Sequence, residues 1–429
     1  MAAGPPPHPR PLMPLDEAWS RLQHALADAG PSSRARPIET VSTEDALGRV
    51  LAEPIASTVN VPPADNSAMD GYAVRTADLQ APGASLPVSQ RIAAGQVGAT
   101  LQPGTCARIF TGAPIPAGAD AVVMQEHTQP GEVEGQVRFM EPVQLGQNIR
   151  LLGEDIAQGQ TVLNPGRRLG PAALGVAASV GRASLSVFAR PRVAVLTTGD
   201  ELVAPGQPLP PGAIYNSNRH TLLGLVKAAG AVGRDLGTVP DQLDATRAAL
   251  RAAAEQHDLV ISSGGVSVGE EDHLRQAVVA EGGLDFWALA IKPGKPFVFG
   301  WLSRADGSRA LYMGLPGNPV ASFVTFLLLV RPVIGCLSGQ GWRLPRPLSL
   351  PAAFNWPRPD KRREFLRARL NAQGQLELHP NQGSGVLSSA AWADGLVDLP
   401  PQATVAEGQP VRWLPMAELL QPSDAERQP

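Results

Sequence analysis

Hydrophobic spacing changes along the chain and marks where helices give way to strands. Residues 15–29 place apolar side chains every three or four positions, as an amphipathic helix does, and Gly30-Pro31 ends the pattern. Ser42 followed by Asp45 predicts the capped start of a second, short helix. Residues 60–149 instead contain short apolar runs between Gly and Pro turns, which predicts a small β-rich domain.

From residue 192 the pattern becomes that of an α/β region. Val193–Leu196 and Leu259–Ile261 are short, continuous apolar runs of the kind found in buried parallel strands. Helical spacing follows at 218–229 and 244–256, strands are expected at 286–291, 296–301 and 310–313, and a long helix is expected to start near Asn318. This order predicts a mostly parallel sheet with helices on both faces, in which ligands bind beyond the carboxyl ends of the strands.

A chain of 429 residues exceeds one ordinary core, so we expect an α/β multidomain protein. The apolar segment Pro171–Val180 follows the β-rich part and is expected to rejoin the N-terminal helical part. The predicted units are a helical linker domain at 14–58 and 150–190, an inserted β-rich domain at 59–149, an αβα three-layer domain at 191–340, and a C-terminal β-barrel or sandwich at 345–415.

Composition narrows the function classes. A net charge of −3 and a pI near 6.2 argue against a nucleic-acid binder. Only two cysteines are present, which excludes a disulfide scaffold or a cysteine-based zinc cluster and fits a reducing cytoplasm. No signal peptide is visible in residues 1–14. The apolar stretch Phe323–Leu337 is broken by Arg331-Pro332 and is too short to span a bilayer, so we expect a buried helix and no membrane contact.

Three loops interrupt the α/β region directly after apolar runs, at Ser262–Asp272, Ile291–Pro296 and Gly314–Pro319. The chain contains only four lysines, and two of them, Lys292 and Lys295, share the second loop. A lysine ammonium is a compact point charge that arginine does not replace, and glycine lets backbone N–H groups approach an anion closely. The loops therefore predict a pocket for a phosphorylated or oxyanionic ligand together with a metal ion.

Each of these loops also has a purely structural explanation. The Ser/Gly loop resembles a tight strand-to-helix connection and matches neither the Walker pattern nor the dinucleotide fingerprint. Asn318 and Pro319 are typical of an N-cap and a first helical position, and a helix N-terminus also attracts anions. Glu201, Asp241 and Asp272 follow apolar segments, and if they converge they would offer the hard oxygen ligands that Mg²⁺ prefers.

A further set of polar motifs lies outside the α/β region. It comprises Asp65–Tyr72, Thr111–Pro114 and Gly153–Asp155. By residue type alone these segments are typical of turns, in which Asn, Asp and Gly dominate. These segments indicate a particular function only when they are considered together with the loops of the α/β region.

Taken together, the motifs resemble those of the MoeA-type molybdopterin molybdenumtransferases, which are related to the second enzymatic domain of gephyrin. The matching pieces occur in the family's order from about Leu15 to Leu414: Asp65–Val74, Phe110–Pro114, Gly153–Ile156, Thr198–Leu202, the Ser/Gly loop with Asp272, Ile291–Pro296 and Pro316–Val320. The resemblance implies an elongated homodimer with active sites shared between subunits, a linker, an inserted β domain, an αβα domain and a C-terminal β-barrel.

The resemblance also implies an activity. Such an enzyme takes adenylylated molybdopterin and molybdate, inserts molybdenum and releases AMP, with Mg²⁺ as cofactor. Catalytic roles then fall on Asp65, Thr111, Asp155, Glu201, Asp241 and Asp272, and Glu201, Asp241 and Asp272 would hold the metal. Substrate-binding roles fall on Gly264, Gly265, Ser267, Lys292, Lys295, Pro316, Gly317, Asn318, Pro319, Arg362 and Ser384, although Arg363 and Arg367 are alternatives to Arg362 as the anion contact.

Two other functions fit parts of the sequence. Small stand-alone proteins that adenylylate molybdopterin from ATP share the Ser/Gly and Pro-Gly-Asn-Pro loops, but they lack the Asp65–Tyr72 segment and the C-terminal domain that are present here. A gephyrin-like scaffold is the second alternative, and the intact Lys and Asp set argues against a loss of activity. The family also implies transient contacts with an adenylyltransferase and with molybdoenzymes.

Overall fold

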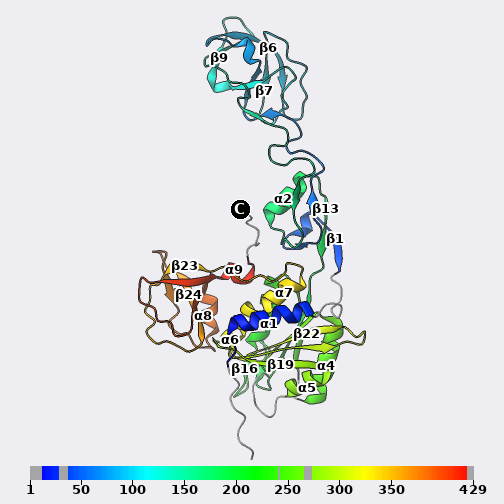
Figure 1. The fold of residues 1–429 in the computed structure, drawn as a ribbon, viewed down its shortest axis with the longest axis vertical. Helices are drawn as coiled ribbons and strands as arrows, with labels where there is room; N and C mark the ends of the chain where they lie inside the picture. Colours follow the sequence, from blue (N-terminus) through cyan, green and yellow to red (C-terminus); the bar gives the residue numbers. More distant parts are fainter. Residues whose placement is uncertain (1–11, 29–36, 240–241, 265–272, 423–429) are drawn as a thin grey trace, which may run out of the picture.

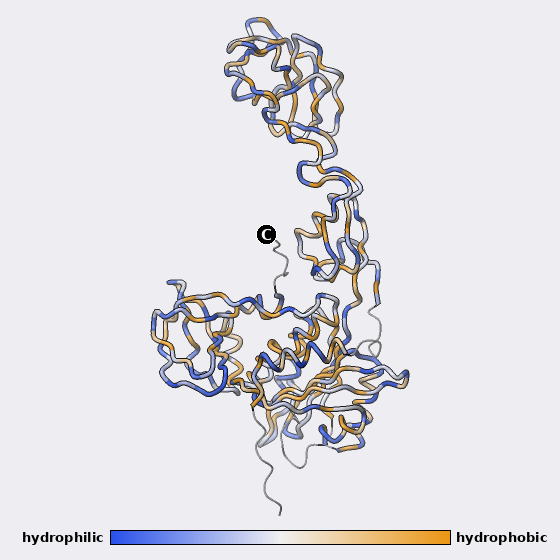
Figure 2. Tube along the Cα trace, in the orientation of Figure 1, coloured by the Kyte–Doolittle hydropathy of each residue, from blue (hydrophilic) through white to orange (hydrophobic). Residues whose placement is uncertain are grey.

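A computed structural model describes residues 12–28, 37–239, 242–264 and 273–422. The chain is elongated, with a β domain at one end, a narrow linker, and a broad α/β body beside a C-terminal sheet (Figure 1). Hydrophobic segments gather mainly along the sheet and central helices of the body (Figure 2). The multidomain α/β class and the mostly parallel sheet expected from the sequence are confirmed.

The linker is assembled from two distant stretches of chain. Strand β13 (Ser184–Phe188) pairs antiparallel with β1 (Ile38–Ser42) and with β2 (Val50–Leu51), and β12 (Thr161–Leu163) pairs with β3 (Ile55–Ala56). Among the described residues of this unit, the one α-helix is α2 (Pro171–Ser179), which packs on the strands. The short helix after Ser42 is observed as the 3-10 helix η2 (Glu44–Ala46), with Ser42 Oγ accepting from Asp45 N–H at 3.1 Å. The linker is thus more strand than helix.

The inserted β domain contains one six-stranded sheet in the order β8-β5-β7-β6-β10-β9. Neighbouring residues of its central strands face opposite apolar clusters: Ala73 and Ala107 lie in one, and Val74 and Cys106 in the other. Both faces are therefore covered. The strands are β5 (Gly71–Val74), β6 (Ser85–Ile92), β7 (Cys106–Ile109), β8 (Ala121–Met124), β9 (Thr128–Pro130) and β10 (Gln136–Phe139), with a small ribbon of β4 (Asn66–Ser67) and β11 (Ile149–Arg150) at the base.

The α/β body is built on a sheet in the order β17-β14-β18-β22-β21-β19. The first four strands are parallel; β21 runs antiparallel to them, and the edge strand β19 pairs antiparallel with β21 and so runs in the direction of the first four. Alternating residues of β14 enter separate apolar clusters on the two faces, as a strand buried on both sides requires. The strands are β14 (Arg192–Thr198), β17 (Val232–Val239), β18 (Leu259–Ser263), β19 (Gly282–Ala288), β21 (Pro296–Ser303) and β22 (Arg309–Leu315).

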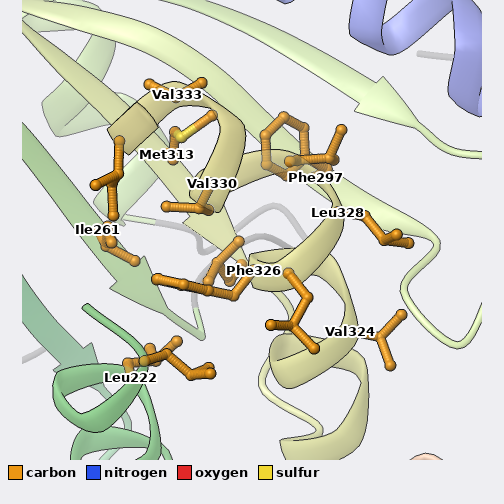
Figure 3. Close-up of a cluster of buried hydrophobic side chains, with 14 of the residues drawn as sticks. Leu222, Ile261, Phe297, Met313, Val324, Phe326, Leu328, Val330 and Val333 are labelled. Atoms are coloured by element: carbon orange, nitrogen blue, oxygen red, sulfur yellow. The ribbon is translucent and has the colours of Figure 1, made fainter. Parts of the chain in front are cut away.

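Helices cover both faces of this sheet. On one face lie α4 (Leu243–Gln256) and α5 (His273–Glu281), and on the other lie α3 (Ser217–Ala228) and the apolar helix that begins at Pro319. Figure 3 shows the second face, where Phe326 and Val330 of that helix lie among Leu222, Ile261 and Met313. The N-terminal helix α1 (Leu15–Asp28) also packs here, and Trp19 Nε1–H donates to Leu328 O at 2.8 Å. The first helix of the chain thus joins the α/β core and not the linker.

The apolar helix corrects one expectation. It runs unbroken from Pro319 to Leu337 as α6 (Pro319–Thr325), a π-helical turn η5 (Phe326–Val330) and α7 (Arg331–Leu337), and Arg331-Pro332 does not interrupt it. The wider π turn directly before Pro332 provides a place for a residue that lacks a backbone N–H. It is the one helix in the described part of the chain long and apolar enough to span a membrane, and 83% of its most apolar window is buried inside the protein, as expected for a core helix.

The C-terminal sheet has the order β20-β24-β26-β27-β23, and β25 pairs antiparallel with the last residues of β24, outside this path. Strand β20 (Ile291–Lys292) comes from the α/β body and pairs parallel with β24 (Arg363–Leu370), so this sheet joins the two parts of the chain. Directly after β23, Ala352 forms an isolated bridge with Leu376, and Ala353 N–H donates to Leu376 O at 2.7 Å, so the ends of the sheet meet there at a single bridge. One bridge is not a full strand pairing, and a closed barrel is not confirmed. The remaining elements are β23 (Leu348–Pro351), β25 (Leu376–Leu378), α8 (Leu387–Trp392), β26 (Gly395–Leu399), β27 (Pro410–Pro415) and α9 (Met416–Leu420).

Candidate functional site

Three predicted loops meet at one edge of the α/β sheet. Strands β14, β18 and β22 are parallel, and Thr197 lies beside Ser263, which lies beside Leu315. Their carboxyl ends therefore coincide. Strand β21 runs antiparallel to β22, with Val298 opposite Gly314, so the Lys292–Lys295 loop that precedes β21 reaches the same edge. The topology thus gathers most of the candidate substrate-binding residues of the α/β region.

Close backbone packing shapes this edge. Gly264 has a φ of +91°, and a Cβ there would lie 2.9 Å from the carbonyl oxygen of Thr198. Its N–H donates to Leu315 O at 3.2 Å. The side-chain amide of Asn218, on α3, donates to Ser263 Oγ at 2.8 Å and to Gly317 O at 2.7 Å, which ties two of the loops together. Asn218 was not identified from the sequence, because an Asn inside a helical pattern gives no sign of its long-range partners.

The start of α6 organises a second group of candidates. Asn318 is the N-cap and Pro319 is the first helical residue, as predicted, but the Asn318 side chain makes no capping hydrogen bond. Val320 N–H donates to Ser384 O at 2.9 Å, which places Ser384 of the C-terminal part against this helix. Gly294 packs on the same helix, where a Cβ would lie only 2.5 Å from Thr325 Oγ1. The lysine loop and Ser384 therefore both contact α6.

Lys292 lies in a network of charged side chains that joins the α/β body to the C-terminal sheet. Its Nζ is 2.9 Å from Glu364 Oε1 and 3.3 Å from Asp360 Oδ2. The register of β20 and β24 places Lys292 directly beside Glu364. Arg362 donates to both oxygens of Asp360, from Nε at 3.1 Å and from Nη2 at 3.0 Å.

The charge states of this network follow from these contacts. The hydrogen bond to Glu364, with the nearby carboxylate charges, raises the pKa of Lys292, although partial burial opposes the shift. The hydrogen bonds from Arg362 and then Lys292 hold the pKa of Asp360 well below its usual range. Lys292 and Arg362 are therefore cationic and Asp360 is ionised at neutral pH. Asp360 and Glu364 were not among the predicted site residues, because one sequence does not show that a carboxylate near Arg362 meets a lysine about seventy positions earlier.

The three neighbouring arginines of β24 and its approach have different surroundings. Arg363 donates from Nε and Nη2 to the buried carboxylate of Asp398, at 2.6 and 2.7 Å. Arg367 is buried and donates to Ser389 Oγ and to two backbone carbonyls, and burial lowers the pKa of Arg367 to about 10. Only Arg362 shares a partner with Lys292. Geometry therefore favours Arg362 as the anion contact among the three.

The predicted metal ligands lie mostly outside the described residues. Glu201 follows β14 and is exposed, and its carboxylate turns back toward Gly199, where a Cβ would lie 2.6 Å from Oε2. Asp241 and Asp272, like Gly265 and Ser267, fall in segments that the structure does not describe. Among the described ranges, no group of three His, Cys, Asp or Glu side chains is arranged to hold a metal ion. The magnesium site thus stays a prediction.

The remaining candidates cluster at the base of the β domain. Asp65 Oδ1 accepts from Leu152 N–H at 2.7 Å, and Asp155 N–H donates to Val61 O at 3.0 Å, so these two loops are joined. Thr111 donates from both N–H and Oγ1 to Asp70 Oδ1, at 2.8 Å each, and these bonds lower the pKa of Asp70. Figure 1 places this domain at the far end of the molecule from the sheet edge. One chain therefore does not bring Asp65, Thr111 and Asp155 together with the lysine loop.

Models of known protein families match nearly the whole chain. Three family models match in succession: "MoeA N-terminal region (domain I and II)" over residues 13–181, "Probable molybdopterin binding domain" over 194–335, and "MoeA C-terminal region (domain IV)" over 349–416.

Curated relatives and solved structures agree. The molybdopterin molybdenumtransferase of Haemophilus influenzae is 40% identical over 416 residues, which cover 95% of this chain and 100% of the relative, and that of Bacillus subtilis is 36% identical, over 90% of each chain. A crystal structure of the molybdopterin biosynthesis MoeA protein from Pyrococcus horikoshii OT3 aligns with a TM-score of 0.80 at 28% identity, covering 94% of this chain and 100% of that one. A second crystal structure, also of a molybdopterin biosynthesis MoeA protein from Pyrococcus horikoshii, aligns with a TM-score of 0.74 at 31% identity, covering 94% of this chain and 99% of that one.

Proposed function

This chain belongs to the MoeA family and is a molybdopterin molybdenumtransferase of molybdenum cofactor biosynthesis; from that premise, we propose that it inserts molybdenum from molybdate into adenylylated molybdopterin and releases AMP. The observation that supports this reaction most strongly is the cationic pair of Lys292 and Arg362. Lys292 belongs to the loop that precedes β21 and reaches the sheet edge where β22 ends. Gly294 of this loop packs on Thr325 of α6, and Ser384 O accepts from Val320 N–H at the start of the same helix, which supports a shared site.

Electrostatics explains why such a site needs these residue types. Molybdate is a dianion and the phosphates of the pterin substrate are also negative, so the two repel each other unless cations screen them. Lys292, Arg362 and Lys295 would bind the molybdate oxygens, and the side chain of Ser384 would donate a further hydrogen bond. Gly317 and Asn318 would contact the pterin phosphates through backbone N–H groups. The N–H of Gly264 donates to Leu315 O, so Gly264 would contribute by having no side chain to hold the anion away.

Magnesium would complete the charge balance. Glu201 offers an exposed carboxylate at the sheet edge, and oxygen ligands of this kind suit Mg²⁺. We propose that Glu201, Asp241 and Asp272 hold the ion. When bound, Mg²⁺ would neutralise the phosphate oxygens from which AMP is released. The residues of this chain would then orient the pterin phosphates against the lysine loop.

A homodimer with shared sites would unite the two groups of candidates. Asp65, Thr111 and Asp155 lie on the β domain, far from the sheet edge of their own chain (Figure 1). We propose that they face the sheet edge of a second copy, so that each site takes acidic residues from one subunit and the lysine loop from the other. The two free cysteines fit a cytoplasmic location for this dimer.

The alternatives explain less of the structure. An adenylyltransferase or a scaffold would have no use for Arg362 and Ser384, which the C-terminal part adds to the α/β site. Transient contacts with an adenylyltransferase, which would supply the substrate, and with molybdoenzymes, which would receive the product, remain part of the proposal.

One assay tests the proposed reaction directly. The purified protein is incubated with adenylylated molybdopterin and Mg²⁺, with and without molybdate, and AMP is quantified. We expect AMP release only when molybdate is present. Release of AMP without molybdate at the same rate would point to hydrolysis, and formation of adenylylated pterin from ATP would favour the adenylyltransferase.

A further inference from the structure

A carboxylate lies between the two cations that would bind molybdate. Asp360 Oδ2 is 3.3 Å from Lys292 Nζ and 3.0 Å from Arg362 Nη2, and Asp360 Oδ1 accepts from Arg362 Nε at 3.1 Å. Two oxygens of one anion thus meet three donors from two cations. This is the set of contacts that an oxyanion would make with Lys292 and Arg362.

The second carboxylate of the network is held differently. Glu364 lies within β24, its side chain is only 3% exposed, and its other oxygen accepts from Trp356 Nε1 at 3.0 Å. It therefore fixes one side of Lys292 and has no route to solvent. Asp360 lies outside regular structure before β24 and its side chain is 19% exposed, so it can rotate away without breaking a strand pairing.

We propose that Asp360 is an internal competitor for the oxyanion: it occupies the subsite between Lys292 and Arg362, and molybdate binds by displacing it. The inference rests on the proposed function, because it takes this subsite as the molybdate site. Glu364 keeps Lys292 in place throughout the exchange. A dianion gains more from the two cations than the singly charged carboxylate does, whereas a monovalent anion gains nothing over it. Asp360 would therefore select divalent oxyanions against chloride and other monovalent anions.

A double-mutant cycle separates displacement from simple charge repulsion. Asp360→Asn preserves the acceptor for Arg362 N–H, which lies 3.0 Å from Asp360 Oδ1, but an amide cannot engage both donor groups of the arginine side chain as a carboxylate does. If molybdate displaces Asp360, the variant frees Arg362 for molybdate, so the gain in molybdate affinity must depend on Arg362. If Asp360 only repels molybdate, the gain in molybdate affinity should be the same whether or not Arg362 is present. The cycle therefore uses wild type, Asp360→Asn, Arg362→Gln and the double variant.

The readout is the molybdate concentration that half-saturates AMP release at saturating adenylylated pterin. We expect Asp360→Asn to lower this molybdate concentration about three- to tenfold, because molybdate no longer has to break a partly exposed ion pair of Asp360, and to change kcat little. In the Arg362→Gln background the same substitution should change it less than about twofold. Chloride should inhibit Asp360→Asn more strongly than wild type. Glu377→Gln is the matched control, because it removes one carboxylate from an Arg369 pair on the same sheet, and it should leave the concentration unchanged.

Three results would overturn the inference. The first is a higher half-saturating molybdate concentration in Asp360→Asn than in wild type. The others are a decrease in that concentration as large as the one in Asp360→Asn alone, caused either by Asp360→Asn in the Arg362→Gln background or by Glu377→Gln. Circular dichroism and thermal unfolding establish that each variant is folded. If wild type releases no AMP with molybdate, the proposed reaction is wrong. Equilibrium dialysis of molybdate against the same proteins then decides whether Asp360 competes for the anion.

Discussion

Replacing Lys292 by alanine tests the anion site and the charged network together. The substitution removes an ammonium group that lies 2.9 Å from Glu364 and 3.3 Å from Asp360. Asp360 keeps Arg362 as a partner, and Glu364 keeps the indole N–H of Trp356. The variant should therefore fold, but it leaves the charge of Glu364 without its cation and the molybdate subsite with one cation fewer.

The size of each effect follows from burial. A charge-assisted hydrogen bond contributes about 1.5–3 kcal/mol, which corresponds to roughly ten- to a hundredfold in affinity. Because the Lys292 side chain is 45% exposed, solvent screening places the loss of molybdate affinity near the lower end, at about tenfold. The unfolding free energy should fall by about 1–2 kcal/mol, less than for a fully buried pair, since only the Glu364 end is buried.

The assay measures both quantities on the same proteins. Molybdate is titrated at saturating adenylylated pterin, the pterin is titrated at saturating molybdate, and chemical denaturation gives the unfolding free energy. Adding Glu364→Gln to Lys292→Ala should recover stability without recovering molybdate affinity, because it removes the unpaired charge but restores no cation. Lys292→Arg should recover part of the affinity, since its planar group presents donors differently. An unchanged molybdate dependence with weakened pterin binding would refute the assignment and move Lys292 to the phosphate side of the site.

Further predictions concern other parts of the site. Asp241→Asn and Asp272→Asn should each abolish most AMP release at limiting Mg²⁺ with an unchanged circular dichroism spectrum, and wild-type turnover in either would exclude it as a metal ligand. Mixing inactive Asp65→Asn with inactive Asp272→Asn should restore part of the activity, because one site of each heterodimer receives two intact halves; no recovery despite demonstrated subunit exchange would argue against shared sites. Gly264→Ala should lower the unfolding free energy by about 1–3 kcal/mol, because its Cβ would lie 2.9 Å from Thr198 O at a φ of +91°, and denaturation curves that match wild type would show that the loop adjusts freely. The pKa of Lys292 is raised in the folded protein, so the protonated lysine adds to the unfolding free energy at every pH below the lysine pKa of the unfolded chain. This added stability should be lost as the pH rises through the pKa of Lys292 in the folded protein. A Lys292→Gln variant should therefore lose less stability than wild type over that alkaline range, as denaturation curves at several pH values would measure.

Local patterns predicted the elements that depend on local chemistry. The helix at 15–29, the Ser42–Asp45 turn, the Asn318-Pro319 helix start and five of the six strands of the α/β sheet follow from residue spacing and capping preferences, although β19 begins a few residues earlier than expected. The edge strand β17 was not predicted, because Gly and charged residues interrupt its apolar pattern. Because parallel strands share one edge, the convergence of the loops after β14, β18 and β22 also follows from their order.

The remaining features depend on contacts between distant residues. The amphipathic pattern of α1 shows that one face is buried but not against what, and Trp19 meets Leu328 far along the chain. Arg362, Arg363 and Arg367 look alike in sequence, and only their partners Asp360, Asp398 and Ser389 distinguish them. Strand spacing in the C-terminal part likewise predicts strands but not whether the sheet closes.

The insertion of the β domain within the linker has a consequence for the order in which the chain folds. Strand β1 can pair with β13 only after a segment of well over a hundred residues has been brought back on itself, and closing such a loop costs conformational entropy. The β4–β11 ribbon joins the two ends of the inserted domain, with Asn66 beside Arg150. Once this ribbon has formed, the loop that remains to be closed is less than half as long, a saving of at least about 0.6 kcal/mol. We therefore expect the β domain to nucleate early and the linker to assemble behind it, so that a cut within the β domain would slow the refolding of a region it does not touch.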